Sequence, residues 1–152
     1  MGLRVAMVGE MPADRSRIVG GVQSATAYLI AGLAARGGIE LHVITLDYRA
    51  TQDVRRAEGG VTYHRLATPP RLGLLTLHAA ARRRLARTLD AIRPDVVHGI
   101  GTGVHAYVAL RSGYPCLLTV HGVQREDAKH YAGLRTRLHG WLQGCLLYTS
   151  DA

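Results

Sequence analysis

Hydrophobic and polar positions along the chain fall into blocks that predict strands followed by helices. Several short runs are almost wholly apolar, which is typical of strands covered on both faces of a parallel sheet. Longer segments instead repeat apolar residues at helical spacing and end at glycine or proline. The predicted strands are residues 3–8, 39–46, 61–66, 95–100 and 116–120, and the predicted helices are residues 22–36, a second long helix whose apolar stripe runs from Leu74 to Ile92, and residues 104–111.

The alternation of strands and helices predicts an α/β fold. We expect a Rossmann-like parallel sheet with helices on both faces and right-handed crossovers between its strands. In the first predicted helix, Val22, Ala25, Leu29 and Leu33 recur at the spacing of one apolar stripe. The polar segment 47–60 is interpreted as the connection between the second and third strands.

A pair of glycines, Gly20 and Gly21, precedes the first predicted helix. It follows a polar loop, residues 10–18, that projects from the carboxyl end of the first strand, where open α/β sheets bind their ligands. Two glycines let backbone N–H groups approach an anion closely, and the helix dipole behind them favours negative charge. The pair is therefore a candidate anion site, although a flexible turn before a helix explains the same residues.

Other candidate residues lie near the ends of later strands. His121 stands at the carboxyl end of the last predicted strand, immediately before Gly122, and is a site candidate or a structural hydrogen-bonding histidine. His98 is interpreted as a strand-end histidine that caps local backbone. Gly101 belongs to a glycine cluster, residues 99–103, that could line a ligand. Glu126 could act as an acid or base near a hydroxyl, or begin the next helix together with the residue that follows it.

Length and composition fit one globular domain. The chain has 152 residues, 47% of them hydrophobic, which is enough to bury one core. No apolar run reaches the roughly 18–20 residues that span a bilayer, and the first strand does not have the form of a signal peptide. We therefore expect a cytoplasmic protein. The two cysteines, Cys116 and Cys145, have neither metal-ligand spacing nor the pattern of a disulfide framework.

The formal net charge of +8 is carried almost entirely by arginine, because Lys129 is the only lysine. The run Arg82–Arg84, with Arg87 one turn later, is interpreted first as a solvated helix face. Its alternative is a peripheral contact with anionic lipid headgroups at the inner face of the membrane, since basic amphipathic helices bind such surfaces. No nucleic-acid partner is expected, because the run lacks interleaved aromatic residues for base stacking.

The last eight residues, 145–152, differ in character from the rest of the chain. Their sequence CLLYTSDA resembles the translation of a transposon adapter used in sequencing libraries. We therefore exclude this tail from reasoning about the fold, and expect residues 1–144 to be the domain and the natural chain to continue beyond it. An ordinary carboxyl terminus is the alternative.

The order and spacing of four segments resemble the amino-terminal domain of family 4 retaining glycosyltransferases, which have the GT-B fold. These segments are Gly20–Val22, the strand 39–46, the block 93–98 with sequence RPDVVH, and residues 115–122. The resemblance covers nearly all of residues 3–144. The family pattern often has a second histidine where this chain has Ile100, so any contact made by that histidine does not carry over.

The resemblance implies a cleft between two Rossmann-like domains, of which the amino-terminal one mainly receives the acceptor and the carboxyl-terminal one holds the nucleotide. It implies transfer of a sugar from a nucleotide-sugar to an acceptor hydroxyl with retention, without a metal or other cofactor. By position, Gly20 and Gly21 would lie beside the donor phosphates and His121 near the transferred sugar. Gly122, Gly101 and Glu126 complete the expected substrate-binding set. The donor-binding domain is absent from these residues, so we expect the fragment to be inactive alone.

Two other classes of protein remain open. A nicotinamide-binding Rossmann domain would carry a Gly-x-Gly-x-x-Gly turn directly after the first strand and an acidic residue after the second. Residues 9–12, with sequence GEMP, lack that turn, although Asp47 does follow the second strand. A flavodoxin-like binding or regulatory module without transferase activity is the other alternative. Such modules usually carry shorter loops than residues 10–18.

Overall fold

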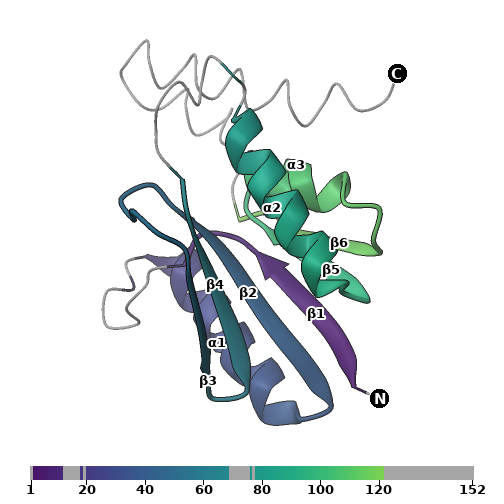
Figure 1. The fold of residues 1–152 in the computed structure, drawn as a ribbon. Helices are drawn as coiled ribbons and strands as arrows, with labels where there is room; N and C mark the ends of the chain where they lie inside the picture. The colour runs from purple at the N-terminus through teal and green to yellow at the C-terminus, as the bar shows by residue number, and fades with distance from the viewer. Residues whose placement is uncertain (1, 12–17, 19, 69–75, 77, 122–152) are drawn as a thin grey trace.

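A computed structural model describes residues 2–11, 18, 20–68, 76 and 78–121 of the chain. Within them an α/β fold is present, with strands and helices in alternation along most of the chain (Figure 1). The strands are β1 (Leu3–Val8), β2 (Ile39–Asp47), β3 (Val54–Glu58), β4 (Val61–Ala67), β5 (Val96–Ile100) and β6 (Cys116–Thr119), and the helices are α1 (Gly21–Arg36), α2 (Ala79–Ile92) and α3 (Val104–Leu110).

The strands form one sheet of six, in the order β3-β4-β2-β1-β5-β6. Neighbouring strands are parallel except for β3, which runs antiparallel to β4 at one edge. In the centre, β1 pairs with β2 and β5, placing Met7 opposite both Val43 and His98. The predicted Rossmann-like sheet is therefore confirmed, with one antiparallel strand added at its edge.

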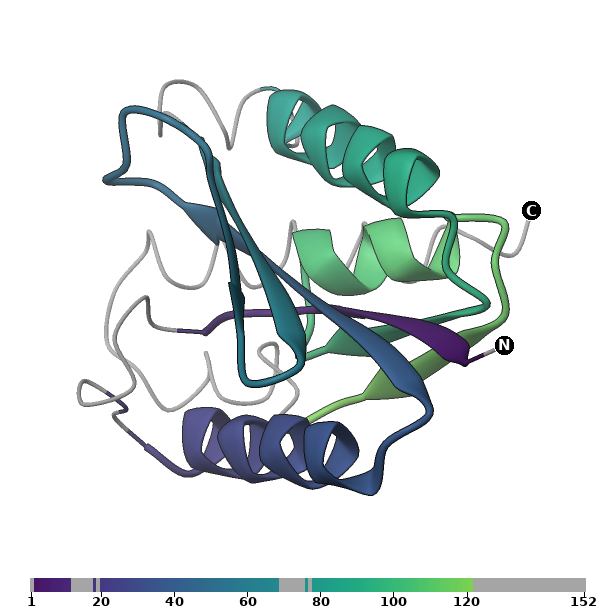
Figure 2. The ribbon, with the colours of Figure 1, turned by 60° about the horizontal axis from the view of Figure 1, so that its bottom comes forward.

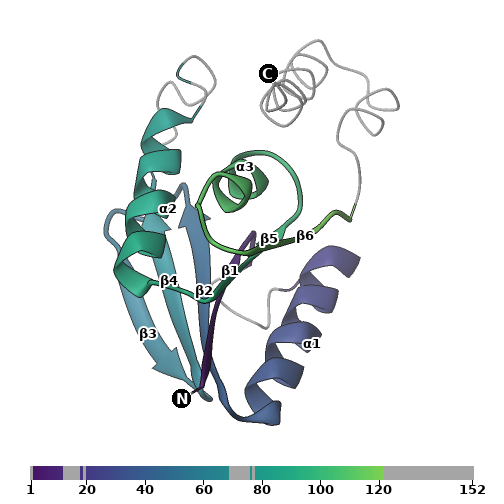
Figure 3. The same ribbon diagram turned by 90° about the vertical axis from the view of Figure 1, so that its right-hand side faces the viewer.

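Helices cover both faces of the sheet, as predicted. Figure 2 and Figure 3 show α1 on one face and α2 with α3 on the other. Alternate residues of each strand face the two layers, and each layer has its own apolar core. On the α2 side Ala6, Val8 and Ile44 pack with Leu85 and Leu89, and on the opposite face Met7 and Ile30 share a second cluster.

The apolar stripe predicted for α1 is wrong except at Leu33, which packs against the core. Thr26 and Ile30 are the buried residues of this helix, whereas Val22 and Leu29 are 42% and 39% exposed. The reason is that α1 carries apolar or small residues around most of its circumference, so the 3.6-residue period selects no single face. Contact with the sheet decides which face is buried.

Strand β3 was not predicted, because segment 47–60 was interpreted as a connection. All five residues of β3 are exposed and three of them are charged, so the strand has no apolar face for a pattern to reveal. Gly59 and Gly60, with φ of 56° and 77°, form the turn that leads from β3 into β4. Two glycines between two strands are a recognised hairpin turn, which was the available sequence evidence.

Candidate functional site

The carboxyl ends of the parallel strands β5 and β6 bring two of the candidate residues, Gly101 and His121, to the same end of the sheet. Register pairs Val8 of β1 with Gly99 of β5, and Ile100 of β5 with Thr119 of β6. Pairing continues just past the strands, because Gly101 donates its N–H to the Thr119 carbonyl at 2.8 Å. Gly101 therefore lies at the same edge as the residues that follow β6, as the sequence predicted.

Two glycines allow the close packing beneath this edge. A Cβ added to Gly9 would lie 2.9 Å from the Ile100 Cβ. A Cβ added to Gly99 would lie 2.8 Å from the Ala109 Cβ of α3 and 3.0 Å from Leu118 Cδ1. Distances this short are not tolerated between carbon atoms, so only glycine lets β1, β5 and α3 approach as they do.

The amino terminus of α1 begins at a glycine without a side-chain cap among the described residues. Gly20 is its N-cap, with φ of 91°, and no side chain caps this end within the described part of the chain. Ser24 directs both its N–H and its hydroxyl to the Gly20 carbonyl, at 3.2 and 3.0 Å. A Cβ on Gly20 or Gly21 would meet no described atom within 4 Å. The positive end of the helix dipole lies at this terminus.

Two histidines lie near each other on β5 and just past β6. His98 is 6% exposed, and its Nε2 is 2.8 Å from the Thr119 hydroxyl oxygen. Burial, and then the charge of nearby His121, lower the pKa of His98. His121 itself is exposed. His98 therefore has a structural hydrogen bond, as predicted. Its partner is the Thr119 side chain, whereas the prediction was local backbone.

Two further polar groups belong to the region around the strand ends, and sequence reasoning missed both. Tyr48 follows β2, and its pKa is raised by burial and then by the negative charge of Glu10, which follows β1. The Thr45 hydroxyl donates to the Gly9 carbonyl at 3.2 Å and ties the two strand ends together. The position of Tyr48, directly after a predicted strand, was the sequence evidence that could have identified it.

His105, in the first turn of α3, is a third group that sequence reasoning missed. It is 4% exposed, and no hydrogen-bond partner of its Nε2 is found among the described residues. Its pKa is lowered to about 4, mainly by burial and secondly by the positive charge of His78. The imidazole is therefore neutral at physiological pH. Its place just after the glycine cluster of residues 99–103 was visible in the sequence, but its burial was not.

Several sequence predictions concern residues outside the described ones. Gly122, Glu126, the tail 145–152 and most of loop 10–18 belong to this group. Among the residues that are described, no cluster of three or more histidine, cysteine, aspartate or glutamate side chains is placed to hold a metal ion. None of the helices in the described ranges has both the length and the apolar character that crossing a membrane requires.

Comparison with known proteins identifies similar domains. The family model described as "Glycosyl transferase 4-like domain" matches residues 20–152. Among solved structures, sucrose-phosphate synthase from Thermosynechococcus elongatus is similar, with a TM-score of 0.61 and 17% sequence identity over 98% of this chain and 41% of that one. No curated protein matches the chain significantly. The chain thus spans about two fifths of the synthase, and at this identity the likeness shows a shared fold.

Proposed function

The chain belongs to the glycosyl transferase 4-like domain family, and from this premise we propose that it forms the acceptor-side half of a retaining glycosyltransferase. The enzyme would move a hexose-type sugar from a nucleotide-sugar donor to an acceptor hydroxyl. The observation that carries the proposal is the family match over residues 20–152, which includes the glycine N-cap of α1 and the strand ends beside it. The nucleotide would be held by a second domain, outside these residues.

In this proposal Gly20 and Gly21 stabilise the departing nucleoside diphosphate. Negative charge develops on the diphosphate as the bond to the sugar breaks, and backbone N–H donors already in place lower the barrier. The lack of a side-chain cap on α1 within the described residues supports this role. Backbone amides and basic side chains would then do the work that a metal ion does in other transferases.

His121 is proposed to contact the transferred sugar near the reaction centre. Its exposure at the strand-end edge supports this role, and the hydrogen bond between His98 and Thr119 braces the strand that carries it. Gly101 would line the acceptor side, with its φ of 87° held by the turn after β5. Gly122 and Glu126 keep their proposed roles in substrate binding.

The cellular location belongs to the same proposal. We propose a cytoplasmic enzyme, with peripheral contact at an anionic membrane as the alternative. Supporting the alternative is a groove of about 340 Å³ between α2 and α3 that is lined by Arg82, Arg83 and Arg111. The guanidinium of Arg82 lies 4.9 Å from the centre of the Tyr107 ring in this groove. Cosedimentation with anionic vesicles distinguishes the two locations.

The test uses the full-length enzyme and a sugar-transfer assay. His121→Ala is expected to lower kcat about tenfold or more, because a contact made in the transition state is lost, while the unfolding midpoint stays unchanged. Val120→Ala, at the exposed neighbouring position, is the control and should keep wild-type turnover. Wild-type activity in His121→Ala would show that this histidine is only structural.

Ligand binding tests the class of protein independently of His121. A thermal-shift screen of the full-length protein would include sugar nucleotides, dinucleotides and flavins. Stabilisation by a sugar nucleotide supports the transferase. Stabilisation by a dinucleotide or flavin alone would instead favour a nicotinamide-binding or flavodoxin-like module.

A further inference from the structure

A second cavity lies on the α2 side of the sheet, away from the strand-end edge. It has a volume of about 460 Å³ and lies between β1, β2, β3, β4 and the carboxyl-terminal half of α2. Arg4 and Glu40 are the second residues of β1 and β2, so the cavity begins at the amino ends of these strands. Its ionisable lining residues are Arg4, Glu40, His42, Arg55, His64 and Arg87.

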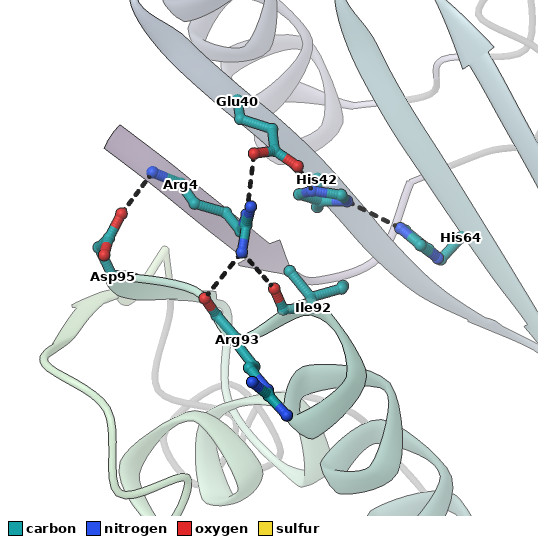
Figure 4. A network of polar contacts seen from close by, with 7 residues as sticks. All are labelled: Arg4, Glu40, His42, His64, Ile92, Arg93 and Asp95. Carbon is teal, nitrogen blue, oxygen red and sulfur yellow. Dashed lines mark hydrogen bonds and ion pairs between the residues drawn. The ribbon is translucent and has the colours of Figure 1, made fainter. Parts of the chain in front are cut away.

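One wall of the cavity is a chain of hydrogen bonds (Figure 4). Both oxygens of Glu40 are used, because Oε2 accepts from Arg4 Nε at 2.9 Å and Oε1 lies 3.0 Å from His42 Nε2. These contacts with His42 and then Arg4 lower the pKa of Glu40. His42 is 5% exposed, and its Nδ1 lies 3.0 Å from Nε2 of His64. Both carboxylate oxygens of Glu40 are therefore engaged by cationic or ring N–H groups of the wall.

The same wall is fixed to the end of α2. Arg4 Nη1 donates to the carbonyls of Ile92 and Arg93, at 3.0 and 3.4 Å, and so caps the helix. Asp95 accepts from the backbone N–H of Arg4 at 2.7 Å. A cation at the carboxyl end of a helix also interacts favourably with the helix dipole. The wall is thus held by β1, β2 and α2 before any ligand arrives.

The opposite sides of the cavity carry two arginines that make no ion pair within the described part of the chain. These are Arg55 of the edge strand β3 and Arg87 of α2. Nearby arginines do have carboxylate partners: Arg56 with Glu58, Arg65 with Asp47 and Arg84 with Asp53. The cavity therefore has an excess of positive charge that its own carboxylate does not neutralise.

The pKa of His64 agrees with this excess of positive charge. The pKa of His64 is lowered to about 4, first by burial and then by the positive charges of His42 and Arg55. An anion in the cavity would oppose the last two effects, so the His64 ring is a natural reporter of binding.

We propose that this cavity binds a phosphate-class oxyanion between the guanidinium groups of Arg55 and Arg87. Guanidinium groups match the oxygens of phosphate with paired hydrogen bonds, and two groups from different elements can contact the same anion. The site is separate from the proposed transfer site, since Arg55 lies on the edge strand β3, which β4 and β2 separate from β1, and Arg87 lies on α2. The proposed transfer site instead lies around the carboxyl ends of β5 and β6. An oxyanion here would tie the edge strand β3 to α2 and act as a regulatory or anchoring ligand.

The test is a titration of the 152-residue chain with inorganic phosphate at constant ionic strength, followed by the NMR signals of the His64 ring. We expect a saturable shift. Arg55→Gln and Arg87→Gln should each weaken binding about tenfold, because each removes charge-assisted hydrogen bonds to the anion. Both side chains are exposed, so the variants should fold, which far-UV circular dichroism checks.

Two control variants each remove one arginine from the same elements, as the cavity variants do. Arg56→Gln removes the neighbouring charge on β3, and Arg83→Gln removes a charge of α2 that lines the other groove. Both should leave phosphate affinity within about twofold, because long-range effects of exposed charges are screened by salt. A shift that does not saturate, that chloride reproduces, or that the controls weaken as much as the cavity variants would overturn the proposal.

Vesicles distinguish a lipid phosphate from a free one. The chain is mixed with phosphatidylcholine vesicles that contain phosphatidic acid, whose headgroup is a phosphate monoester. Cosedimentation that is lost in Arg55→Gln and Arg87→Gln assigns a lipid headgroup, and saturable phosphate binding without cosedimentation assigns a soluble phosphate compound. Cosedimentation that persists in both variants, with no binding of free phosphate, contradicts the site.

Discussion

Burial decides the chemistry of the histidines more than their sequence positions do. His98 and His121 lie on neighbouring strand ends, but His98 is covered and bonded to Thr119 whereas His121 is exposed. The sequence could predict that both stand near the strand ends, because strand boundaries follow from apolar runs. It could not predict that His105 is buried, since that depends on how α3 packs against α2 and β5. The proposed role of His121 remains a prediction.

His105 should make the fold sensitive to acid. Its pKa is about 4 in the folded chain and 6.5 for an ordinary histidine, so the folded state binds fewer protons in this interval. Stability is complete above pH 6.5 and falls as the pH drops towards 4, by up to about 3 kcal/mol for this group. His105→Leu should remove this part of the loss. Urea unfolding of both proteins at pH 7 and pH 4.5 measures it.

The half-buried His64 also contributes to the acid sensitivity measured in that experiment. Its pKa is lowered to about 4 as well, so His105→Leu should still lose stability in acid, but less than the wild type. Because the Nε2 of His105 has no partner among the described residues, leucine should cost little stability at pH 7. An equal loss of stability between the two pH values in both proteins would contradict a neutral, buried His105.

At the scale of elements, the boundaries of the strongly patterned strands and helices were predictable and those of the polar elements were not. The predicted strand 3–8 and helix 104–111 agree with β1 and α3 to within one residue. The edge strand β3 was missed because an exposed strand needs no apolar residues, and its charged residues protect a sheet edge. For α1 the helix was predictable, but its buried face was not, since apolar residues surround it.

Gly99 should control the docking of α3 onto β5. In Gly99→Ala the new Cβ would lie 2.8 Å from the Ala109 Cβ, which belongs to a helix and cannot rotate away. We expect a loss of about 1–3 kcal/mol from overpacking, and a lower unfolding temperature measured by calorimetry.

Gly32→Ala is the matched control for this substitution. Gly32 lies within α1, and a Cβ there would meet nothing within 4 Å. Alanine should raise stability by about 0.5–1 kcal/mol through helix propensity. Equal effects of the two substitutions would show that the close approach at Gly99 is not a constraint on the fold.

At the scale of the whole molecule, two separate regions around the sheet differ in their chemistry. The carboxyl ends of β5 and β6 carry Gly101 and the exposed His121. The α2 face carries a hydrogen-bonded wall, and beside it Arg55 and Arg87, which make no ion pair within the described residues. The parallel sheet and the helices on both faces could be predicted from the alternation of elements and the crossover rule, whereas the order of the strands was not predicted. The second cavity could not be predicted, because its six ionisable residues come from five elements far apart in the sequence.

The chain 1–152 alone should fold but should not transfer sugar. Its sheet and both apolar cores lie within the described residues, so cooperative unfolding is expected. Transfer needs the nucleotide held against the acceptor, and in our proposal a second domain holds it. An assay with several nucleotide-sugars should therefore detect product with the full-length enzyme and none with this chain, while circular dichroism shows both folded. Robust transfer by the 152-residue chain would contradict the division of labour between two domains, without affecting the proposed phosphate site.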